Sequence, residues 1–477
     1  MKKNNVVIVG AGPSGLAAAT ESLKNTNNIK IFEKTNNVGG LARSEKFRDC
    51  IFDVGPHRFY TLNKEINEFF KNNIDNESIK VKRLTRILYK KKLFLYPLSP
   101  FNTLLRLGFI EAIEMLISYS SIRIKSIFKK KTIKNFEDWV IFNFGNKLYS
   151  TFFKSYTEKV WGIDCKTISS DWASQRIKNL SFISVLLNPL RKILSKRKIK
   201  SLVDSFLYPK FGAGYFYQIL VDNLKKKNIN INFNSEIKSI NIKDNIVSSI
   251  EVLHGNKVEI HYGDYFLLSN PFTDIFKLLN PKPPQEIINI SNKLRYRNHI
   301  SVQLIIEGKI FDDNWIYVHD QNLKMARVSN YRNFSPHMSP NKNINPVTIE
   351  YFCFENDNIW KQNDEYLKEL ATKELLESGL ISKKDKIVDG YIIRSPKAYP
   401  VIEKGYDEKV ELLKNYINSF KNLIPIGRSG MFKYNNQDHA MATGLYAARN
   451  LFTENIIDIW KINSEGVYVE SDIEINK

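Results

Sequence analysis

The first forty residues alternate between short apolar runs and polar turns. Residues 6–9 are a β-branched run typical of a buried parallel strand, and an alanine-rich segment that favours a helix begins near residue 16. A second apolar run, residues 29–32, ends at Glu33. This order of strand, turn, helix and strand predicts a βαβ unit, and therefore an α/β fold.

A glycine-rich turn joins the first predicted strand to its helix, and its spacing has a physical meaning. Gly10 permits the tight turn, Gly12 allows the backbone to approach a pyrophosphate, and Gly15 allows close packing of helix and strand. Glu33 lies 21 residues beyond Gly12, where an acid can hold a ribose hydroxyl. The residues expected to bind the dinucleotide here are Gly10, Gly12, Pro13, Ser14, Gly15, Glu33 and Lys34.

Two further glycines follow the acidic residue. Residues 37–44 read Asn-Val-Gly-Gly-Leu-Ala-Arg-Ser and resemble the GG motif of flavoproteins in the amine oxidase and protoporphyrinogen oxidase superfamily. The resemblance implies FAD as the cofactor, with contacts from Gly39, Gly40, Leu41, Ala42 and Arg43. No cysteine lies in the segment around residue 430 that is expected to contact the flavin, so we expect FAD to be bound non-covalently.

Longer motifs resemble a narrower group, the UDP-galactopyranose mutases. Residues 52–59 resemble their D-x-G-x-H segment, residues 153–162 their F-K-x-Y-T-x-K-x-W-G segment, and residues 426–439 their G-R-x-G and N-Q-D-H block. These matches run from residue 6 to about residue 450. The resemblance implies interconversion of the pyranose and furanose forms of a nucleotide sugar, for surface polysaccharide synthesis. In that family the FAD is reduced and acts through an adduct between flavin N5 and the sugar.

The same resemblance implies roles for single residues. Arginine presents a fixed fork to phosphate oxygens, so Arg176 and Arg327 are expected to hold the substrate diphosphate from two sides. The full set expected to serve catalysis is His57, Arg176, Arg327, Tyr399 and Tyr434. The side chains expected against the uridine are Tyr156 and Trp161. Further cofactor contacts are expected from His57, Gly427, Arg428, Gln437, Asp438 and His439, although Asp438 is also a candidate N-cap.

The resemblance implies an FAD-binding, Rossmann-like α/β fold of the two-dinucleotide-binding-domain type, and the strand and helix patterns locate its segments along the chain. The expected division is a discontinuous FAD-binding domain (1–75, 205–275 and 385–455), a mainly helical insert (76–204), a strand-rich substrate insert (276–384) and a C-terminal tail (456–477). A last helix is expected over residues 438–451, with its N-terminus directed at the flavin.

Charge and cysteine content narrow the partners. Lys and Arg number 71 and Asp and Glu 50, a formal net charge of +21, which favours anionic partners. No known nucleic-acid-binding module is recognised in the sequence. The resemblance to the mutases implies a UDP-sugar or similar small anion as the partner, and it leaves room for a separate reductant of the flavin. The basic segment 186–200 is either a membrane-surface helix or an ordinary amphipathic helix. Three widely spaced cysteines and no apparent signal or membrane-spanning segment indicate the cytoplasm.

A second function is compatible with every FAD motif described above. An oxidase or desaturase of the amine oxidase or protoporphyrinogen oxidase type would replace the arginine pair with an apolar tunnel. Arg176, Arg327 and residues 153–162 argue against this alternative, whereas Arg58, which replaces an aliphatic residue of the mutase pattern, keeps it open. The sequence indicates no metal site, and it leaves the sugar and the oligomeric state open.

Overall fold

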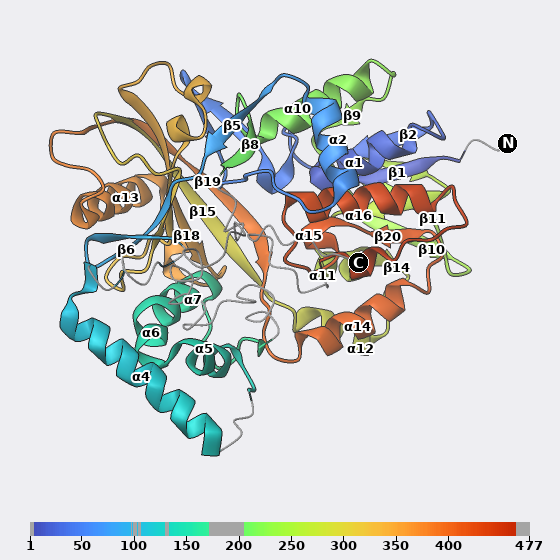
Figure 1. Ribbon diagram of the computed structural model, residues 1–477. Helices are drawn as coiled ribbons and strands as arrows, with labels where there is room; N and C mark the ends of the chain where they lie inside the picture. Colours follow the sequence, from blue (N-terminus) through green and yellow to red (C-terminus); the bar gives the residue numbers. More distant parts are fainter. Residues whose placement is uncertain are drawn as a thin grey trace.

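The computed structural model describes residues 4–96, 98, 103, 106–128, 133–170 and 205–463. A parallel five-stranded sheet forms its nucleotide-binding half (Figure 1), with the order β20-β13-β1-β2-β9. Every residue of β1 is buried, as a β-branched run in the middle of a parallel sheet requires. The strands are β1 (Val6–Val9), β2 (Ile29–Phe32), β9 (Ile231–Asn232), β13 (Tyr265–Leu268) and β20 (Leu423–Pro425).

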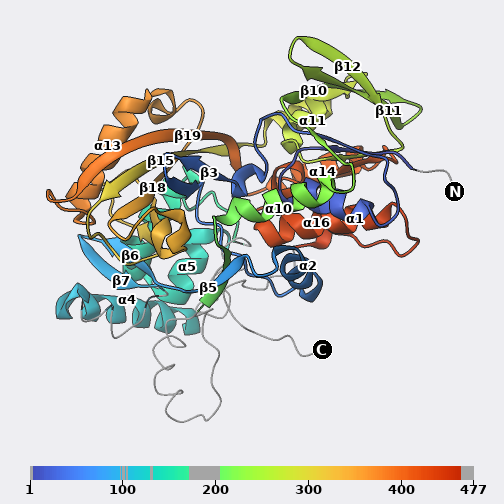
Figure 2. The ribbon, with the colours of Figure 1, turned by 90° about the horizontal axis from the view of Figure 1, so that it is seen from above.

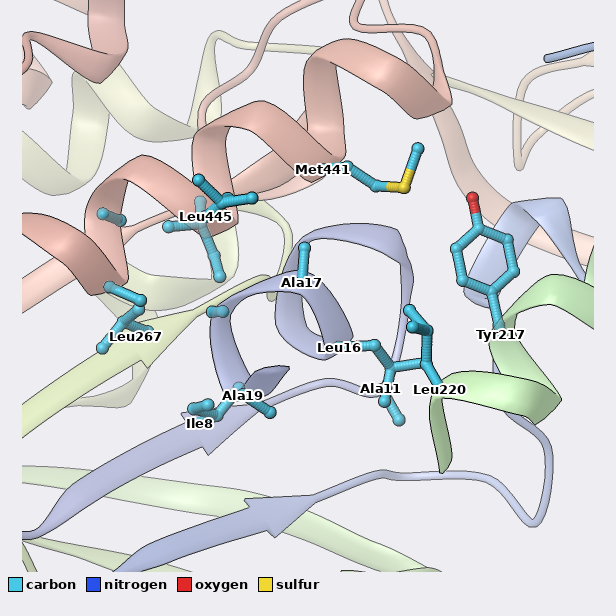
Figure 3. Packing of buried hydrophobic residues seen from close by; sticks show 14 of the residues in the cluster. Ile8, Ala11, Leu16, Ala17, Ala19, Tyr217, Leu220, Leu267, Met441 and Leu445 are labelled. Atoms are coloured by element: carbon cyan, nitrogen blue, oxygen red, sulfur yellow. The ribbon is translucent and has the colours of Figure 1, made fainter. Parts of the chain in front are cut away.

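Three helices pack on this sheet: α1 (Pro13–Ser22), α10 (Ala213–Lys225) and α16 (Gln437–Asn450). Figure 3 shows Leu16 and Ala17 of α1 lying between Leu445 of α16 and Leu220 of α10. The crossing of α1 and α16 is very close, because a Cβ on Gly444 would lie 1.9 Å from the carbonyl oxygen of Ser14. Small residues on both helices thus allow their backbones to approach this closely.

A seven-stranded mixed sheet forms the second half, in the order β19-β15-β18-β17-β16-β6-β7. Helix α13 (Asp364–Ser378) packs on it through Leu367, Ala371 and Leu375. The strands are β6 (Thr85–Tyr89), β7 (Lys92–Leu95), β15 (Tyr296–Glu307), β16 (Trp315–Val318), β17 (Arg327–Asn330), β18 (Ile344–Cys353) and β19 (Lys386–Pro400).

A helical group lies beside this sheet, with α4 (Phe109–Phe128) at its outer edge in both Figure 1 and Figure 2. It continues through α5 (Phe136–Phe144), α6 (Asn146–Leu148), a π-helical turn (Tyr149–Phe153) and α7 (Lys154–Trp161). Its core includes Phe136, Val140, Phe152 and Trp161.

Three smaller sheets and several connecting helices complete the described part of the chain. A four-stranded sheet contains β10 (Ser235–Lys243), β11 (Ile246–His254), β12 (Lys257–Tyr262) and β14 (Leu279–Asn280). Two-stranded pairs are formed by β3 (Ser44–Phe47) with β4 (Cys50–Asp53), and by β5 (Ser78–Lys82) with β8 (Ser205–Pro209). The other helices are α2 (Lys64–Ile74), α11 (Phe272–Leu278), α12 (Gln285–Asn292), α14 (Tyr406–Ile417) and α15 (Gly427–Gly430).

Strand pairing differs from the expected division in two places. β19 pairs along its length with β15, so residues 386–400 belong to the second sheet and not to the nucleotide-binding domain. β6 and β7 also join that sheet, although residues 76–204 were expected to be mainly helical. Long strands need hydrogen-bonding neighbours, and these segments supply them. The basic segment 186–200 lies outside the described residues. Within the described ranges, no helix has the length and apolar character to cross a membrane.

Candidate flavin and substrate site

Two glycine loops face each other at the carboxyl end of β1. Gly10 has φ +102°, and a Cβ on Gly15 would lie 1.9 Å from the carbonyl oxygen of Gly10, so both glycines have the roles that their spacing predicts. Gly12 differs, because its φ is −81° and a Cβ there would meet nothing closer than Gly40 Cα, at 3.9 Å. The two glycine loops therefore pack against each other at van der Waals distance, and Gly12 itself stays partly exposed, without a side chain that would keep a ligand from its backbone.

The acid at the end of β2 holds the first of these loops. Glu33 Oε2 accepts a hydrogen bond from the Ala11 amide at 2.8 Å, and Oε1 accepts from the amide and hydroxyl of Thr35. A carboxylate can accept about four hydrogen bonds, so Glu33 retains capacity for a ribose hydroxyl. Lys34 is exposed and pairs with Glu236 at 2.7 Å. Arg43 pairs with Glu45 at 2.7 Å.

The two glycine loops and Glu33 together form what we call the dinucleotide cradle. The start of α16 contacts the turn at His57, next to this cradle. Gln437 Nε2 donates to the carbonyl oxygens of His57 and Arg58, at 3.1 and 2.9 Å, and Gln437 Oε1 accepts from the Tyr217 hydroxyl. Gln437 thus fixes the turn that carries His57, a role for which its sequence position gave no signal.

Two neighbours of Gln437 were also expected to bind the cofactor. The helix N-cap is Asn436, whose amide donates to His439 Nδ1 at 3.3 Å, so Asp438 is not the cap. Asp438 is buried and its Oδ1 has no hydrogen-bond partner among the described atoms. A buried acceptor without a partner is costly, and a donor on a bound ligand would satisfy it.

His57 is a neutral side chain in this structure. Its Nδ1 lies 2.6 Å from the carbonyl oxygen of Gly55, a contact in which Nδ1–H must donate. Burial, followed by the charges of Arg428 and Arg327, lowers the pKa of His57 to about 3. The ring therefore carries its proton on Nδ1 near neutral pH and presents Nε2 as an acceptor.

A buried ionic network lies close to His57. Arg327 on β17 stands opposite Glu350 on β18, and Arg327 Nε donates to Glu350 Oε1 at 2.6 Å while Nη2 donates to Oε2. His299 Nε2 lies 2.9 Å from the same Oε2. Burial opposes ionisation of Glu350, but Arg327 and His299 lower its pKa to about 2. Glu350 and His299 were not foreseen, although a glutamate within the apolar strand at residues 347–354 is a visible signal.

Aromatic rings surround the second arginine of this region. The Arg428 guanidinium lies 5.0 Å from the Tyr399 ring centroid and 5.1 Å from that of Tyr434, within cation–π range. Arg428 Nε donates to the carbonyl oxygen of Asn435 at 2.6 Å. Trp161 approaches the other side of Tyr434, with ring centroids 5.6 Å apart. The structure thus brings together four of the residues expected from the sequence.

Helix α7 contributes Tyr156 and is fastened to the second sheet. The Tyr156 ring stacks on His319, with centroids 4.4 Å apart and planes at 11°. Lys159 Nζ donates to the carbonyl oxygens of Val318, Asp320 and Met325 at 2.9–3.1 Å. Lys159 therefore holds the helix that positions Tyr156 and Trp161. Arg176, the other expected diphosphate ligand, lies outside the described residues.

Several polar atoms near Tyr156 have no partner. Trp315 Nε1, His319 Nδ1 and Ser329 Oγ are buried and make no hydrogen bond with any described atom. Trp315 and Ser329 are cross-strand partners on β16 and β17, and His319 follows directly after β16. Such atoms are usually satisfied by water or a ligand.

Comparisons with known proteins first define the class of fold. Residues 8–72 match the family model described as NAD(P)-binding Rossmann-like domain. The whole chain superposes on a crystal structure of reduced UDP-galactopyranose mutase with a TM-score of 0.83, covering 98% of each chain at 19% identity. It also superposes on a putrescine oxidase with a TM-score of 0.64, covering 94% of this chain and 98% of that one at 13% identity. These identities establish the fold alone, and they confirm the expected α/β fold with a Rossmann-like dinucleotide-binding domain.

Sequence comparison points to particular mutases. The chain is 27% identical over 169 residues to a probable UDP-galactopyranose mutase of Klebsiella pneumoniae, covering 34% of this chain and 42% of that protein. It is 26% identical over 168 residues to a dTDP-fucopyranose mutase of Escherichia coli, covering 35% and 44%. The matched segments therefore span less than half of these curated relatives. The resemblance to UDP-galactopyranose mutases is confirmed at the level of fold and partial sequence.

Proposed function

We propose that this protein is an FAD-dependent mutase that interconverts the pyranose and furanose forms of a UDP-sugar. The observation that carries the proposal is the convergence of Arg327, Arg428, Tyr399 and Tyr434 around His57, at the mouth of a dinucleotide cradle. The fold shared with a reduced UDP-galactopyranose mutase supports it. We propose surface polysaccharide synthesis as the role and the cytoplasm as the location, in keeping with three buried free thiols.

The residues present fit non-covalently bound FAD. The partly exposed backbone at Gly12 suits a diphosphate, Glu33 suits a ribose hydroxyl, and Asp438 Oδ1, which accepts no hydrogen bond from the described residues, suits a donor on the flavin. Reduced FAD would supply the nucleophilic centre for the anomeric carbon of the sugar while UDP departs. The protein's contribution is to position the cofactor and the substrate and to place charge beside the leaving group.

We propose that the substrate diphosphate is bound by Arg327, by Arg176 and by the hydroxyls of Tyr399 and Tyr434. Glu350 engages Nε and Nη2 of Arg327, so the pair holds the guanidinium rigidly and Nη1 lies outside these two contacts. Arg428 is fixed by a carbonyl and two aromatic rings rather than by an acid. Its charge therefore adds to the positive potential felt by a diphosphate. Tyr156 and Trp161 would contact the uridine through their ring faces.

His57 would act as a neutral neighbour of the flavin. Its Nε2 is an acceptor at physiological pH, because Nδ1 holds the proton and the pKa is lowered to about 3. A neutral acceptor can orient a donor without adding positive charge next to the reacting atoms.

Oxidase chemistry remains the second candidate, favoured by the shared fold with a putrescine oxidase. The charged surroundings of His57 weigh against an apolar substrate, because such a substrate would displace water from Arg327 and Arg428 and form no hydrogen bond with them in return.

The deciding experiment compares the two reactions directly. Purified protein, reduced anaerobically with dithionite, is incubated with UDP-galactopyranose, and the nucleotide sugars are separated by chromatography. The mutase proposal expects many furanose products per flavin with no consumption of reductant. Stoichiometric uptake of oxygen or another acceptor, or a protein without bound flavin, would instead refute it.

Binding tests the assigned arginine. Arg327→Lys keeps the charge but loses the fork, and Arg327→Ala loses both. We expect Arg327→Ala to weaken UDP binding roughly 30- to 150-fold, corresponding to about 2–3 kcal/mol for a charge-assisted contact, and Arg327→Lys to be intermediate. Arg295→Ala is the matched control, because Arg295 pairs with Glu403 at the surface. Equal UDP affinity in all variants would remove Arg327 from the site.

A further inference from the structure

Helix α4 exposes a long apolar stripe. Its most exposed members are Phe109, Ile110, Ile117 and Ile124, whose exposed fractions are 81%, 75%, 63% and 56%. Ile113 and Leu116, at 38% and 40%, join them. The intervals between successive members are one, three, three, one and seven residues, which places all six on one side of the helix.

The opposite side of α4 is already used. Ala112, Met115 and Tyr119 are buried, and Met115 and Tyr119 pack into the core of the helical group. The helix is therefore apolar on two sides, one facing the protein and one facing outward. Core packing explains the first side and leaves the second without a structural purpose among the described residues.

The rim of this stripe is basic. The two acids of α4 are both neutralised, Glu111 by Lys90 at 2.9 Å and Glu114 by Lys147. Across residues 86–134 the sequence contains eleven lysines and arginines, of which Arg86 pairs with Asp313, but only these two acids. Lys125 of the helix is exposed, and three lysines follow the helix directly in the sequence.

We propose that α4 is a docking surface for an anionic lipid membrane, lying in the plane of the interface with its apolar stripe among the headgroups and upper acyl chains. An exposed apolar helix face with basic flanks is what such a surface binds. A second copy of the chain fits less well, because a symmetric contact through α4 would oppose two basic rims. Among the described elements, α4 lies at the outer edge in both Figure 1 and Figure 2, as contact with a flat surface requires. The proposal does not depend on the reaction catalysed.

Vesicle flotation tests the proposal with the full chain. The wild-type protein should float with vesicles made of equal parts phosphatidylcholine and phosphatidylglycerol, and not with phosphatidylcholine alone. Adding salt should weaken the binding. The triple variant Ile110→Ser, Ile117→Ser, Ile124→Ser should lower the partition coefficient at least about tenfold, because it removes apolar area that the interface would bury.

The β12 strand offers a matched control. Val258, Ile260 and Tyr262 are exposed to 55%, 54% and 64%, similar to the isoleucines replaced in α4. Replacing these three by serine should leave vesicle binding unchanged. Circular dichroism and flavin content verify that both triple variants are folded, and Ile117→Glu alone serves as a milder second variant that should also weaken binding.

Four outcomes would overturn the proposal. If the wild-type protein does not float with anionic vesicles, the stripe has another occupant, such as residues 171–204. Equal loss of binding in the β12 control means that general apolarity is responsible. Vesicle binding that survives both α4 variants places the membrane contact elsewhere. Sedimentation that shows a wild-type dimer dissociating in the α4 triple variant means that the stripe is a self-interface.

Discussion

The two halves of the molecule build their candidate sites from different groups. The nucleotide-binding half relies on backbone and glycine, as at Gly12, Gly15 and Gly444, where the absence of a side chain makes the site or the packing. The second sheet relies on charged side chains, with Glu350 and His299 almost fully buried and joined to Arg327. Under the proposed function, the first half would bind its ligand through backbone left uncovered by side chains, and the second through charged side chains.

This contrast has an energetic consequence. A glycine cradle adds little cost to folding, because it buries no charged side chain and its loops are held by backbone hydrogen bonds such as Gly10 N to Phe32 O and Gly39 N to Ala11 O. A buried ionic network costs desolvation and is stable only while every member is present. Substitutions in the second half should therefore damage folding and binding together, whereas the first half should allow the two to be separated.

The largest expected effect is the loss of the buried acid. Glu350→Ala leaves Arg327 and His299 without their shared partner, and we expect the free energy of unfolding to fall by about 3–5 kcal/mol. Urea unfolding measures this. Glu403→Ala removes an acid from a pair with Arg295 at the surface and should change the free energy by less than about 1 kcal/mol. Similar losses in both variants would contradict a special cost for the buried network.

A pH effect follows from the lysine that fastens α7. Burial lowers the pKa of Lys159 from 10.5 to about 8, although Glu374 and Asp320 oppose the shift. Between these two pH values the native state binds fewer protons than the unfolded state, so stability should rise with pH across this window. Over the whole window, the titration of Lys159 should raise the free energy of unfolding by about 3 kcal/mol. Below about pH 8 its contribution is constant.

Lys159→Met should remove this pH dependence. Urea unfolding at pH 7 and pH 10 should show a larger rise in stability for wild type than for the variant. Lys373→Met removes the same charge from an exposed helical position and is the control. A wild-type slope retained in Lys159→Met would mean that Lys159 does not titrate as proposed.

The smallest effect on folding should come from the glycine cradle, where two neighbouring substitutions separate packing from binding. Gly15→Ala places a Cβ 1.9 Å from a carbonyl oxygen and should cost about 1–3 kcal/mol of stability. Gly12→Ala meets no atom closer than 3.9 Å at an allowed φ, so it should preserve stability yet reduce flavin content. Melting temperature and flavin absorbance measure the two effects. Full flavin occupancy in Gly12→Ala would show that the diphosphate lies elsewhere.

Local pattern was enough to predict the first βαβ unit and the last helix of the nucleotide-binding half. The β-branched run at 6–9, the turn at Gly10 and the strand at 29–32 were all located correctly, and the last helix begins at Gln437, one residue before its expected start. These features depend on neighbouring residues, so a short stretch of sequence contains the whole cause. The glycine spacing was informative for the same reason, because each glycine's role is set within one turn.

The second half depended on tertiary structure. His299, Arg327 and Glu350 lie on three different strands, and only the pairing of β15, β17 and β18 brings them together. Residues 386–400 belong to that sheet, and Gln437 hydrogen-bonds to the His57 turn, for the same reason: both depend on contacts between distant parts of the chain. Strand register and helix docking are decided by contacts between residues far apart in the chain. Motif resemblance could place Arg327 and His57 near a ligand, whereas the buried acid between Arg327 and His299 follows from the folded sheet alone.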